Sequence, residues 1–209
     1  MSVREIREMK KYGKYAVVCL LFILLFALGG CSGKKSMEMG QWTDNVFANS
    51  WFDIKVTIPD GYQVLDADEI QSLLGAGQKV IVNDGVMTED QIEKSEGNTI
   101  YDFYVYDSTG TSSLALGYEK LSSSVKEETY LKIVKENLES LNTLNYEIGD
   151  FETVTVGKHE YLRMTASLNG GAVIQEYYVH RNGGYMGFLI VTYNESTKEE
   201  IQSVVQQIQ

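Results

Sequence analysis

The segment Ala172–Tyr193, "AVIQEYYVHRNGGYMGFLIVTY", contains two apolar and aromatic runs separated by a short polar turn. Asn182 and Gly183 are typical of a tight hairpin turn because both residue types tolerate a positive φ. Each run is rich in the β-branched and aromatic residues that favour strands. We therefore predict two antiparallel strands, Ala172 to Arg181 and Tyr185 to Tyr193.

The sequence on either side extends this hairpin. Two further strands are predicted upstream, Phe151 to Val156 and Glu160 to Leu168, and Asn169-Gly170 marks the next tight turn. Downstream, Ser196 followed by Glu199 has the spacing of a capping box. A helix starting at Ser196 would bury four apolar side chains at helical intervals, namely Ile201, Val204, Val205 and Ile208.

The first strand of the domain is predicted in "WFDIKVTIPDGY", where four apolar side chains alternate with polar ones. These are Phe52, Ile54, Val56 and Ile58. The segment "DADEIQSLLGAG" then predicts a helix capped by Asp66 or Asp68 and ending at Gly75 or Gly77.

The middle of the chain predicts a strand in "KVIV", residues 79–82, and a short acidic helix in "TEDQIEKSEG" with Thr88 and Gln91 as its capping box. A strand pair follows in "TIYDFYVYD" and "SLALGYEK", joined by a polar turn at Ser108 to Ser112. The clearest helix is "SVKEETYLKIVKENLESLN", opened by Ser124 with Glu127 three residues later. Strands in hairpin-connected runs indicate an α+β fold, a mainly antiparallel sheet covered by helices.

The first thirty residues have the layout of a secretory signal peptide. Basic side chains precede an apolar run from Ala16 to Leu28, and small residues follow it. The run has thirteen residues, too few for a hydrocarbon core that needs roughly 20 helical residues. We expect residues 1–30 to be a signal peptide, residues 31–47 a flexible tether, and residues 48–209 a single domain.

The end of this segment, Leu28-Gly29-Gly30-Cys31, resembles the lipobox of bacterial lipoproteins. The resemblance implies cleavage between Gly30 and Cys31 and a lipid on the Cys31 thiol, because a thiolate can form the thioether. It also implies a protein anchored to the cell membrane by lipid and facing the extracytoplasmic side. The alternative is a core helix that ends in Gly-Gly-Cys.

The fold pattern also resembles a known family. "FDIKVTIPDGYQVLDADEI" is similar to the opening strand, turn and short helix of the PsbP-like α/β sandwiches, and "GGAVIQEYYVHRNGGYMGFLIVTYNESTKEEIQSVVQQI" to their closing hairpin and helix. This resemblance implies a PsbP-like sandwich that binds or scaffolds other proteins. It carries over no active-site residue and no cofactor.

Charge and cysteine content limit the partners. Removing residues 1–30 takes away five basic and two acidic side chains, which leaves a formal charge of about −14. Nucleic acid would repel such a chain. Cys19 lies in the segment to be removed and Cys31 would carry lipid, so we expect no disulfide in the mature domain.

The sequence offers little for catalysis. No G-x-S-x-G motif is present, and the chain contains two histidines, His159 and His180. A His/His/Glu metal site with Glu160 or Glu176 is an alternative that the spacing does not support. We therefore predict a protein without catalytic activity, metal or cofactor.

Tyrosine is the remaining feature. Tyr104 and Tyr106 share one side of a predicted strand, and alternation places Tyr161 and Arg163 opposite an apolar face. Tyrosine suits interfaces because it offers a large contact area with a polar tip. These four residues are our candidate surface for a protein or cell-envelope partner; the alternative function is a lipoprotein that delivers a small ligand to a membrane partner.

Overall fold

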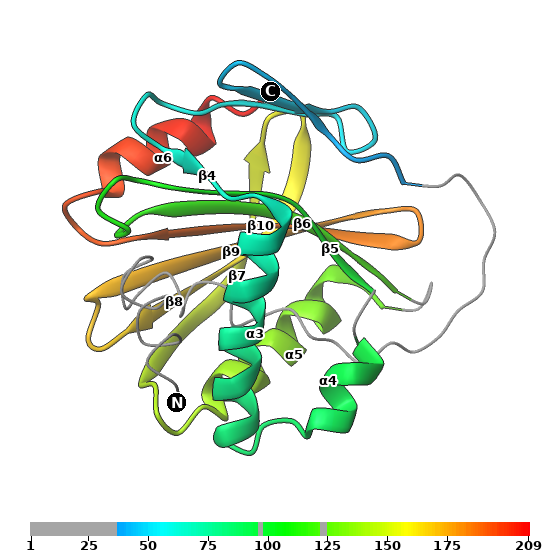
Figure 1. Cartoon of the computed structure of the whole chain (residues 1–209), viewed down its shortest axis with the longest axis vertical. Coiled ribbons are helices and arrows are strands. Elements are labelled where there is room, and N and C mark those ends of the chain that lie inside the picture. Colours follow the sequence, from blue (N-terminus) through cyan, green and yellow to red (C-terminus); the bar gives the residue numbers. More distant parts are fainter. Residues whose placement is uncertain (1–36, 96–97, 122–124) are drawn as a thin grey trace.

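The structure is a computed structural model that describes residues 37–95, 98–121 and 125–209. Within these ranges the chain forms the following helices and strands, shown in Figure 1: β1 (Gln41–Thr43), β2 (Val46–Asn49), β3 (Ile54–Thr57), β4 (Gln63–Val64), α3 (Ala67–Asn83), α4 (Glu89–Ser95), β5 (Thr99–Tyr106), β6 (Ser113–Lys120), α5 (Glu127–Glu139), β7 (Tyr146–Val156), β8 (His159–Leu168), β9 (Val173–Asn182), β10 (Tyr185–Tyr193) and α6 (Lys198–Gln206).

The centre of the fold is an antiparallel sheet with the strand order β4-β5-β6-β10-β9-β8-β7. The strands from β7 to β10 form a meander joined by tight turns, and β10 also pairs with β6. A second, three-stranded sheet has the order β1-β2-β3. The predicted α+β class with a mainly antiparallel sheet is confirmed.

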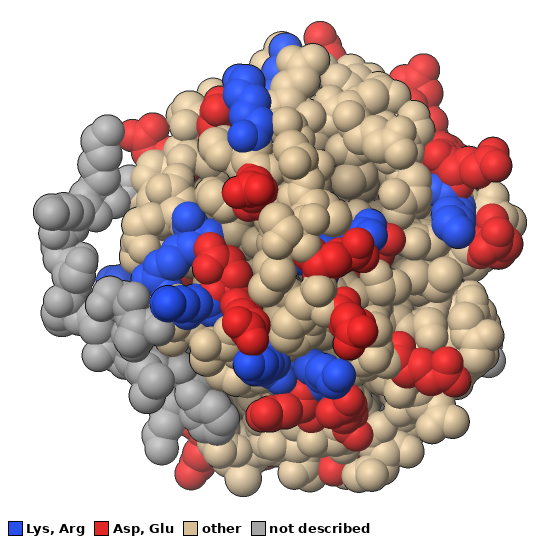
Figure 2. Space-filling model, turned by 180° about the vertical axis from the view of Figure 1, so that it is seen from behind, with Lys and Arg blue, Asp and Glu red and all other residues tan. Residues whose placement is uncertain are grey.

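The layers follow from this topology. In Figure 1, α3, α4 and α5 lie on one side of the large sheet, and α6 and the three-stranded sheet lie on the other. The solvent face of α5 is charged, with Lys132 paired to Glu128 at 2.7 Å and Lys135 to Glu139 at 3.8 Å. Figure 2 shows the molecule from behind, where acidic and basic side chains lie interspersed over the surface.

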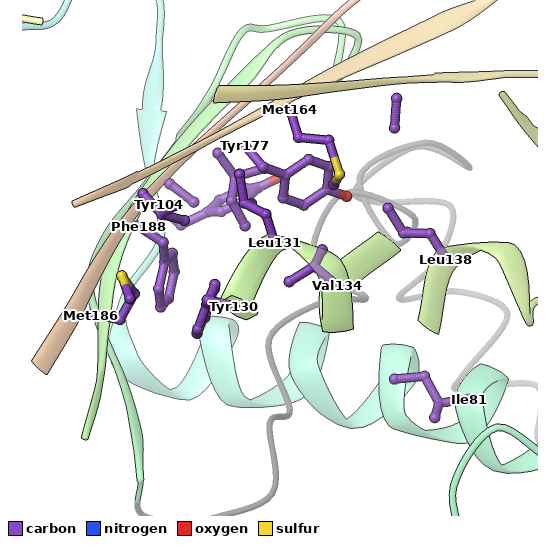
Figure 3. Packing of buried hydrophobic residues seen from close by; sticks show 14 of the residues in the cluster. Ile81, Tyr104, Tyr130, Leu131, Val134, Leu138, Met164, Tyr177, Met186 and Phe188 are labelled. Atoms are coloured by element: carbon purple, nitrogen blue, oxygen red, sulfur yellow. The ribbon is translucent and has the colours of Figure 1, made fainter. Parts of the chain in front are cut away.

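Two hydrophobic clusters fill the spaces between the layers. The cluster on the helix side joins Ile70 and Leu73 of α3 and Leu138 of α5 to sheet residues such as Phe188. In Figure 3, Leu138 and Phe188 of this cluster lie between the sheet and the helices. The cluster on the other side packs Phe47, Val56 and α6 against the opposite face of the same strands.

The opening strand and the closing meander agree with the sequence. Phe52, Ile54, Val56 and Ile58 are all buried on one side of the segment around β3. The four closing strands are present, and β10 has the predicted bounds. The Thr88–Gln91 capping box before α4 is also confirmed, because the Gln91 amide donates to Thr88 Oγ1 and the Thr88 amide to Gln91 Oε1.

Three predictions on boundaries are wrong. The helix predicted to end at Gly75 or Gly77 continues as α3 to Asn83, so "KVIV" is helical rather than a strand. Ile81 of that segment is buried in the hydrophobic cluster on the helix side, and this burial stabilises the helix beyond both glycines. The tether predicted for residues 31–47 is shorter, since β1 begins at Gln41 and pairs with β2.

Two helix starts also differ. α6 begins at Lys198 without the Ser196–Glu199 capping box; instead, the side chain of Asn194 accepts hydrogen bonds from the amides of Ser196 and Thr197. α5 begins at Glu127 after an N-cap at Lys126 that makes no side-chain bond. The predicted cap at Ser124 lies outside the described residues.

The membrane-related predictions fall mostly outside the structure. The apolar run, Gly30 and Cys31 lie before residue 37. In the described part of the chain, no helix combines the length and apolar character that crossing a membrane requires.

Substitution of a glycine at the centre of the large sheet tests this packing. A Cβ on Gly117 in β6 would lie 2.3 Å from Phe188 Cζ and 2.7 Å from the Ile100 carbonyl oxygen. We expect Gly117→Ala to lower the free energy of unfolding by about 1–3 kcal/mol in urea titrations. The control Gly75→Ala, in α3 with no atom within 4 Å, should raise it by about 0.5–1 kcal/mol. Equal effects would contradict the described packing.

Candidate functional site

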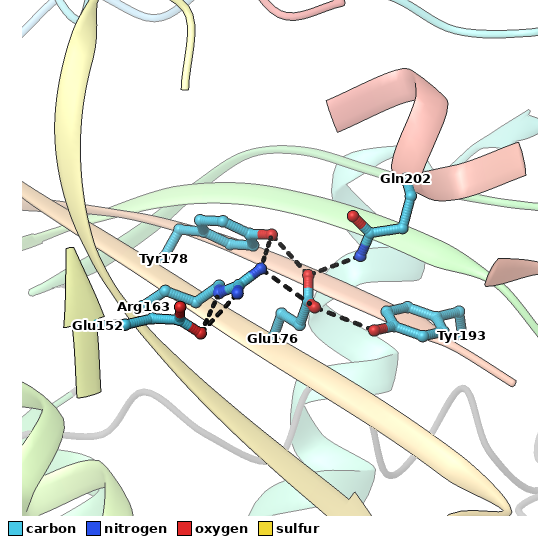
Figure 4. A network of polar contacts seen from close by, with 6 residues as sticks. All are labelled: Glu152, Arg163, Glu176, Tyr178, Tyr193 and Gln202. Atoms are coloured by element: carbon cyan, nitrogen blue, oxygen red, sulfur yellow. Dashed lines mark hydrogen bonds and ion pairs between the residues drawn. The ribbon is translucent and has the colours of Figure 1, made fainter. Parts of the chain in front are cut away.

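A polar network crosses the large sheet on the side of α6. Strand register places Arg163 of β8 beside Glu152 of β7 and Tyr178 of β9. Glu176 lies two residues before Tyr178 on β9, so its side chain points to the same face. Figure 4 shows these side chains together with Tyr193 of β10 and Gln202 of α6; we call the six residues the Arg163–Glu176 network.

Glu176 is the centre of the network. Its side chain is 6% exposed, and its two carboxylate oxygens accept bonds from three uncharged donors. The donors are Tyr178 Oη at 2.5 Å, Tyr193 Oη at 3.0 Å and Gln202 Nε2 at 2.8 Å. A buried carboxylate is costly unless such donors surround it. Glu176 therefore ties α6 to the sheet through Gln202.

Arg163 lies between this buried acid and the surface. Its Nη1 is 3.5 Å from Glu176 Oε1, and its Nε and Nη2 donate to Glu152 Oε1 at 3.1 and 2.5 Å. The guanidinium also lies 5.7 Å from the centre of the Tyr178 ring, within reach of a cation–π contact. The side chains of Arg163 and Glu152 are 23% and 54% exposed, so the network opens to solvent at its Glu152 end.

The pKa values in the network follow from burial and charge. Burial raises the pKa of the Tyr178 hydroxyl, and the hydrogen bond to Glu176 raises it further. Burial also raises the pKa of Tyr193, with the negative charge of Glu176 as the second cause. Burial lowers the pKa of Arg163, but hydrogen bonds to Tyr178 and Glu152 outweigh that effect and the net change is upward. The guanidinium stays charged, and both phenols stay neutral.

This arrangement suits binding by a fixed charge. Contacts on both sides hold the Arg163 guanidinium in one orientation, and a planar guanidinium can bind a carboxylate through two hydrogen bonds. One exposed carboxylate, that of Glu152, occupies that position in the chain itself. An acidic group of a partner could take the same place with little reorganisation of Arg163.

The candidate surface predicted from the sequence is mostly interior. Tyr104, Tyr106 and Tyr161 are 1%, 7% and 3% exposed. The first two pack on the helix side of the sheet and Tyr161 on the opposite side. The expectation that these rings form an exposed face is therefore wrong, because both faces of the sheet are covered. Arg163 alone of the four reaches solvent.

The two histidines do come together. The rings of His159 and His180 lie 5.2 Å apart, and His180 Nδ1 donates to the Glu160 carbonyl at 2.9 Å. Asp53 approaches His159 Nε2 at 3.5 Å. In the described ranges, no group of three or more His, Cys, Asp or Glu side chains is arranged to hold a metal ion.

A second polar cluster connects the two sheets. The Asn49 side-chain amide donates to Asp102 Oδ2 at 2.8 Å and to Tyr118 Oη at 2.9 Å, while Tyr118 also bonds to Asp102. The Gly40 amide donates to the same carboxylate at 2.9 Å. Burial raises the pKa of Tyr118, followed by the charge of Asp102. The cluster fastens the hairpin of β1 and β2 to the large sheet.

Two surface hollows are also present. One of about 390 Å³ lies between the loop after β3 and α6, next to Pro59, Glu200 and Gln207. Another of about 320 Å³ lies between α5 and β7, next to Lys135, Asp150 and Phe151. Polar and charged side chains make up most of both linings.

Comparisons with known proteins bear on the fold. No protein-family model and no curated protein sequence matches the chain. Among solved structures, cyanobacterial PsbP (CyanoP) from Synechocystis sp. PCC 6803 aligns over 87% of this chain and 98% of its own, with a TM-score of 0.50 and 12% identity. The PsbP-like sandwich expected from the sequence is thus confirmed as a fold.

Two more distant structures also align. LpqN, which is involved in cell envelope biogenesis of Mycobacterium tuberculosis, aligns over 74% of this chain and 81% of its own, with a TM-score of 0.42 and 14% identity. A protein from Bacteroides thetaiotaomicron VPI-5482 aligns over 83% of this chain and 48% of its own, with a TM-score of 0.39 and 11% identity. At these identities and TM-scores, neither structure supports an inference about function.

Removing Glu176 tests the network. Glu176→Ala leaves three buried donors without their acceptor and Arg163 with Glu152 as its remaining carboxylate, so we expect the free energy of unfolding to fall by about 3 kcal/mol. The control Glu152→Ala removes the exposed partner of the same arginine and should cost less than about 1 kcal/mol. Chemical denaturation measures both. Equal losses would show that Glu176 is not the centre of the network.

The tyrosine pKa shifts predict a stability loss in alkali. Unfolded tyrosines ionise near pH 10.0, while burial holds Tyr178 and Tyr193 neutral in the folded state. Unfolding then releases protons, so the free energy of unfolding is unaffected well below pH 10 and falls as pH rises above it. Tyr178→Phe should make the fall of the free energy of unfolding with pH less steep by about 1.4 kcal/mol per pH unit. An unchanged slope in urea titrations between pH 9 and 12 would contradict the shift.

Proposed function

We propose that this chain is a lipid-anchored extracytoplasmic protein without catalytic activity that binds a protein or another component of the cell envelope. The signal layout of residues 1–30 and the sequence Leu28-Gly29-Gly30-Cys31 support the anchor. The observation that carries the binding role is Arg163, a charged side chain held in one orientation at the open end of a buried network.

The distance between the anchor and the fold supports a position close to the membrane. Gln41, where β1 begins, is the tenth residue after Cys31. An extended chain spans at most roughly 3.6 Å per residue, so the first strand would lie within about 36 Å of the lipidated thiol. Two acyl chains hold a protein more firmly than one, since each buried CH₂ adds about 0.8 kcal/mol.

Small-ligand delivery is the second candidate, and neither of the two hollows described above favours it. The two hollows are lined mainly by polar and charged side chains. Ligand sites for small molecules are usually lined by apolar and aromatic side chains with few polar groups. We therefore place recognition on the Arg163 surface rather than in a pocket.

The anchor is tested by the intact mass of the protein from the membrane fraction. We expect a chain that lacks residues 1–30 and carries the mass of a diacylglycerol on Cys31. Cys31→Ala should abolish both changes and release the protein from membranes washed with high salt. An unlipidated full-length chain in the membrane fraction would overturn the proposed anchoring.

The binding role is tested by cross-linking in intact cells. Arg163→Lys keeps the positive charge but loses the planar fork, so we expect about tenfold less of any specific cross-linked product. The control Lys55→Arg alters an exposed cation on β3 and should leave the products unchanged. An identical product pattern in wild type and Arg163→Lys would contradict recognition through Arg163.

A further inference from the structure

The large sheet has two edges of very different length. At one edge, β4 contributes two residues. At the other, β7 extends over eleven residues from Tyr146 to Val156. Among the described strands β7 pairs with β8 alone, so from Glu147 to Val156 the backbone groups on its other side have no strand partner there. A long edge with free N–H and C=O groups can accept another strand.

A bulge shapes this edge. Between Ile148 and Phe151, β7 has one residue more than β8 across the same interval. A bulge bends its strand and increases the local twist. The hollow of about 320 Å³ lies beside it, bounded by Gly149, Asp150 and Phe151 and by the charged side of α5. The edge therefore has a recess next to it that an incoming side chain could fill.

The side chains along β7 determine which kind of strand could pair with its edge. Glu147, Asp150 and Glu152 are exposed. Arg163 pairs with Glu152, whereas neither Glu147 nor Asp150 makes an ion pair with any residue in the described ranges. Lys132 and Lys135 on the neighbouring α5 are already paired with acids of their own helix. The edge thus has uncompensated negative charge.

The negative charge of β7 disfavours pairing with a second copy of this chain and favours pairing with a basic strand. A second copy of the chain pairing edge to edge would bring two acidic strands together, and like charges opposite each other destabilise a strand pair. Lysine or arginine side chains on an incoming strand would instead face Glu147 and Asp150. A strand with alternating basic and apolar residues could pair its charges with these acids and place an apolar side chain against Phe151, which borders the otherwise mostly charged recess.

We propose that β7 binds an extended basic segment of a partner protein, which adds to the large sheet as an eighth strand. This inference deepens the proposed binding function and rests on it, since it adds a site for a basic segment of the partner beside the Arg163 guanidinium, which would take an acidic group of the same partner. Backbone hydrogen bonds to β7 give affinity, and Glu147, Asp150 and the recess beside Phe151 give selectivity.

A synthetic peptide provides the probe. We would titrate the full chain in neutral detergent micelles with a nine-residue peptide of alternating lysine and valine, and follow amide hydrogen exchange. We expect saturable binding and slower exchange of outward-facing amides within residues 146–156. The same peptide with N-methyl groups on alternate residues keeps its charge but cannot complete the ladder, and should bind at least about tenfold more weakly. Equal affinity of the two peptides would overturn strand addition.

Charge variants test the selectivity. The double variant Glu147→Lys with Asp150→Lys should weaken peptide binding about tenfold. A matched control, Asp60→Lys with Glu195→Lys, makes the same change of net charge at exposed loop positions and should leave affinity within about twofold. Equal losses in the two double variants would show general attraction to an acidic protein and overturn the site.

Failure of this inference is distinguishable from failure of the proposed function. Peptide binding in detergent does not need the lipid, so Cys31→Ala should bind the peptide like the wild type. Absence of peptide binding, with Cys31 lipidation and Arg163-dependent cross-links intact, would overturn the β7 site alone. Loss of the lipid signal with retained protection of residues 146–156 would overturn the anchor and leave the β7 site standing.

Discussion

Burial of the central strand β10 on both faces is the constraint on which the fold depends. All eight residues from Met186 to Tyr193 are buried, and their side chains alternate between the two hydrophobic clusters. A sheet with two apolar faces needs a layer on each. The helices α3, α4 and α5 supply one layer, and α6 with the three-stranded sheet supplies the other. The polar groups enclosed by this arrangement, above all Glu176, must then find partners inside it.

Much of this architecture was predictable from local signals. The Asn-Gly turns and the apolar alternation predict the closing meander because turn chemistry and side-chain period act within a few residues. The incorrect predictions have a different cause. The segment "KVIV" has strand propensity but is helical, because Ile81, as part of α3, is buried in the hydrophobic cluster on the helix side. The pairing of β1 with β2 was hidden within a polar segment, where Gln41 and Thr43 give no clear alternation.

The site was less predictable than the fold. Alternation separates Tyr104 from Phe103, but it cannot tell which face a second layer will cover, and here both are covered. The sequence does point to Glu176 as a candidate site residue, since it is a carboxylate among apolar and aromatic residues of a central strand. Its partners Tyr193 and Gln202 could not be inferred, because they depend on strand register and on where α6 docks. The long free edge at β7 follows from strand order, which no local pattern reveals.

In the described ranges, the structure combines a rigid centre with a long edge strand, β7, that pairs on one side only, and we propose that binding occurs there. The Arg163–Glu176 network runs from the buried acid to Glu152, which is itself a residue of β7. A basic partner strand along β7 would face Glu147 and Asp150, and an acidic group of the same partner outside that strand would take the place beside the Arg163 guanidinium. Recognition by charge and recognition by backbone pairing would then occur on one continuous surface.

Amide hydrogen exchange of the full chain without any partner tests this account most directly. The outward-facing amides of β7 should exchange quickly at alternate positions, while amides of β9 and β10 should exchange only through global unfolding. That result would show a free edge beside a rigid sheet. Uniform protection along Tyr146–Val156, equal to that of β10, would mean that another segment already covers the edge and would contradict the account.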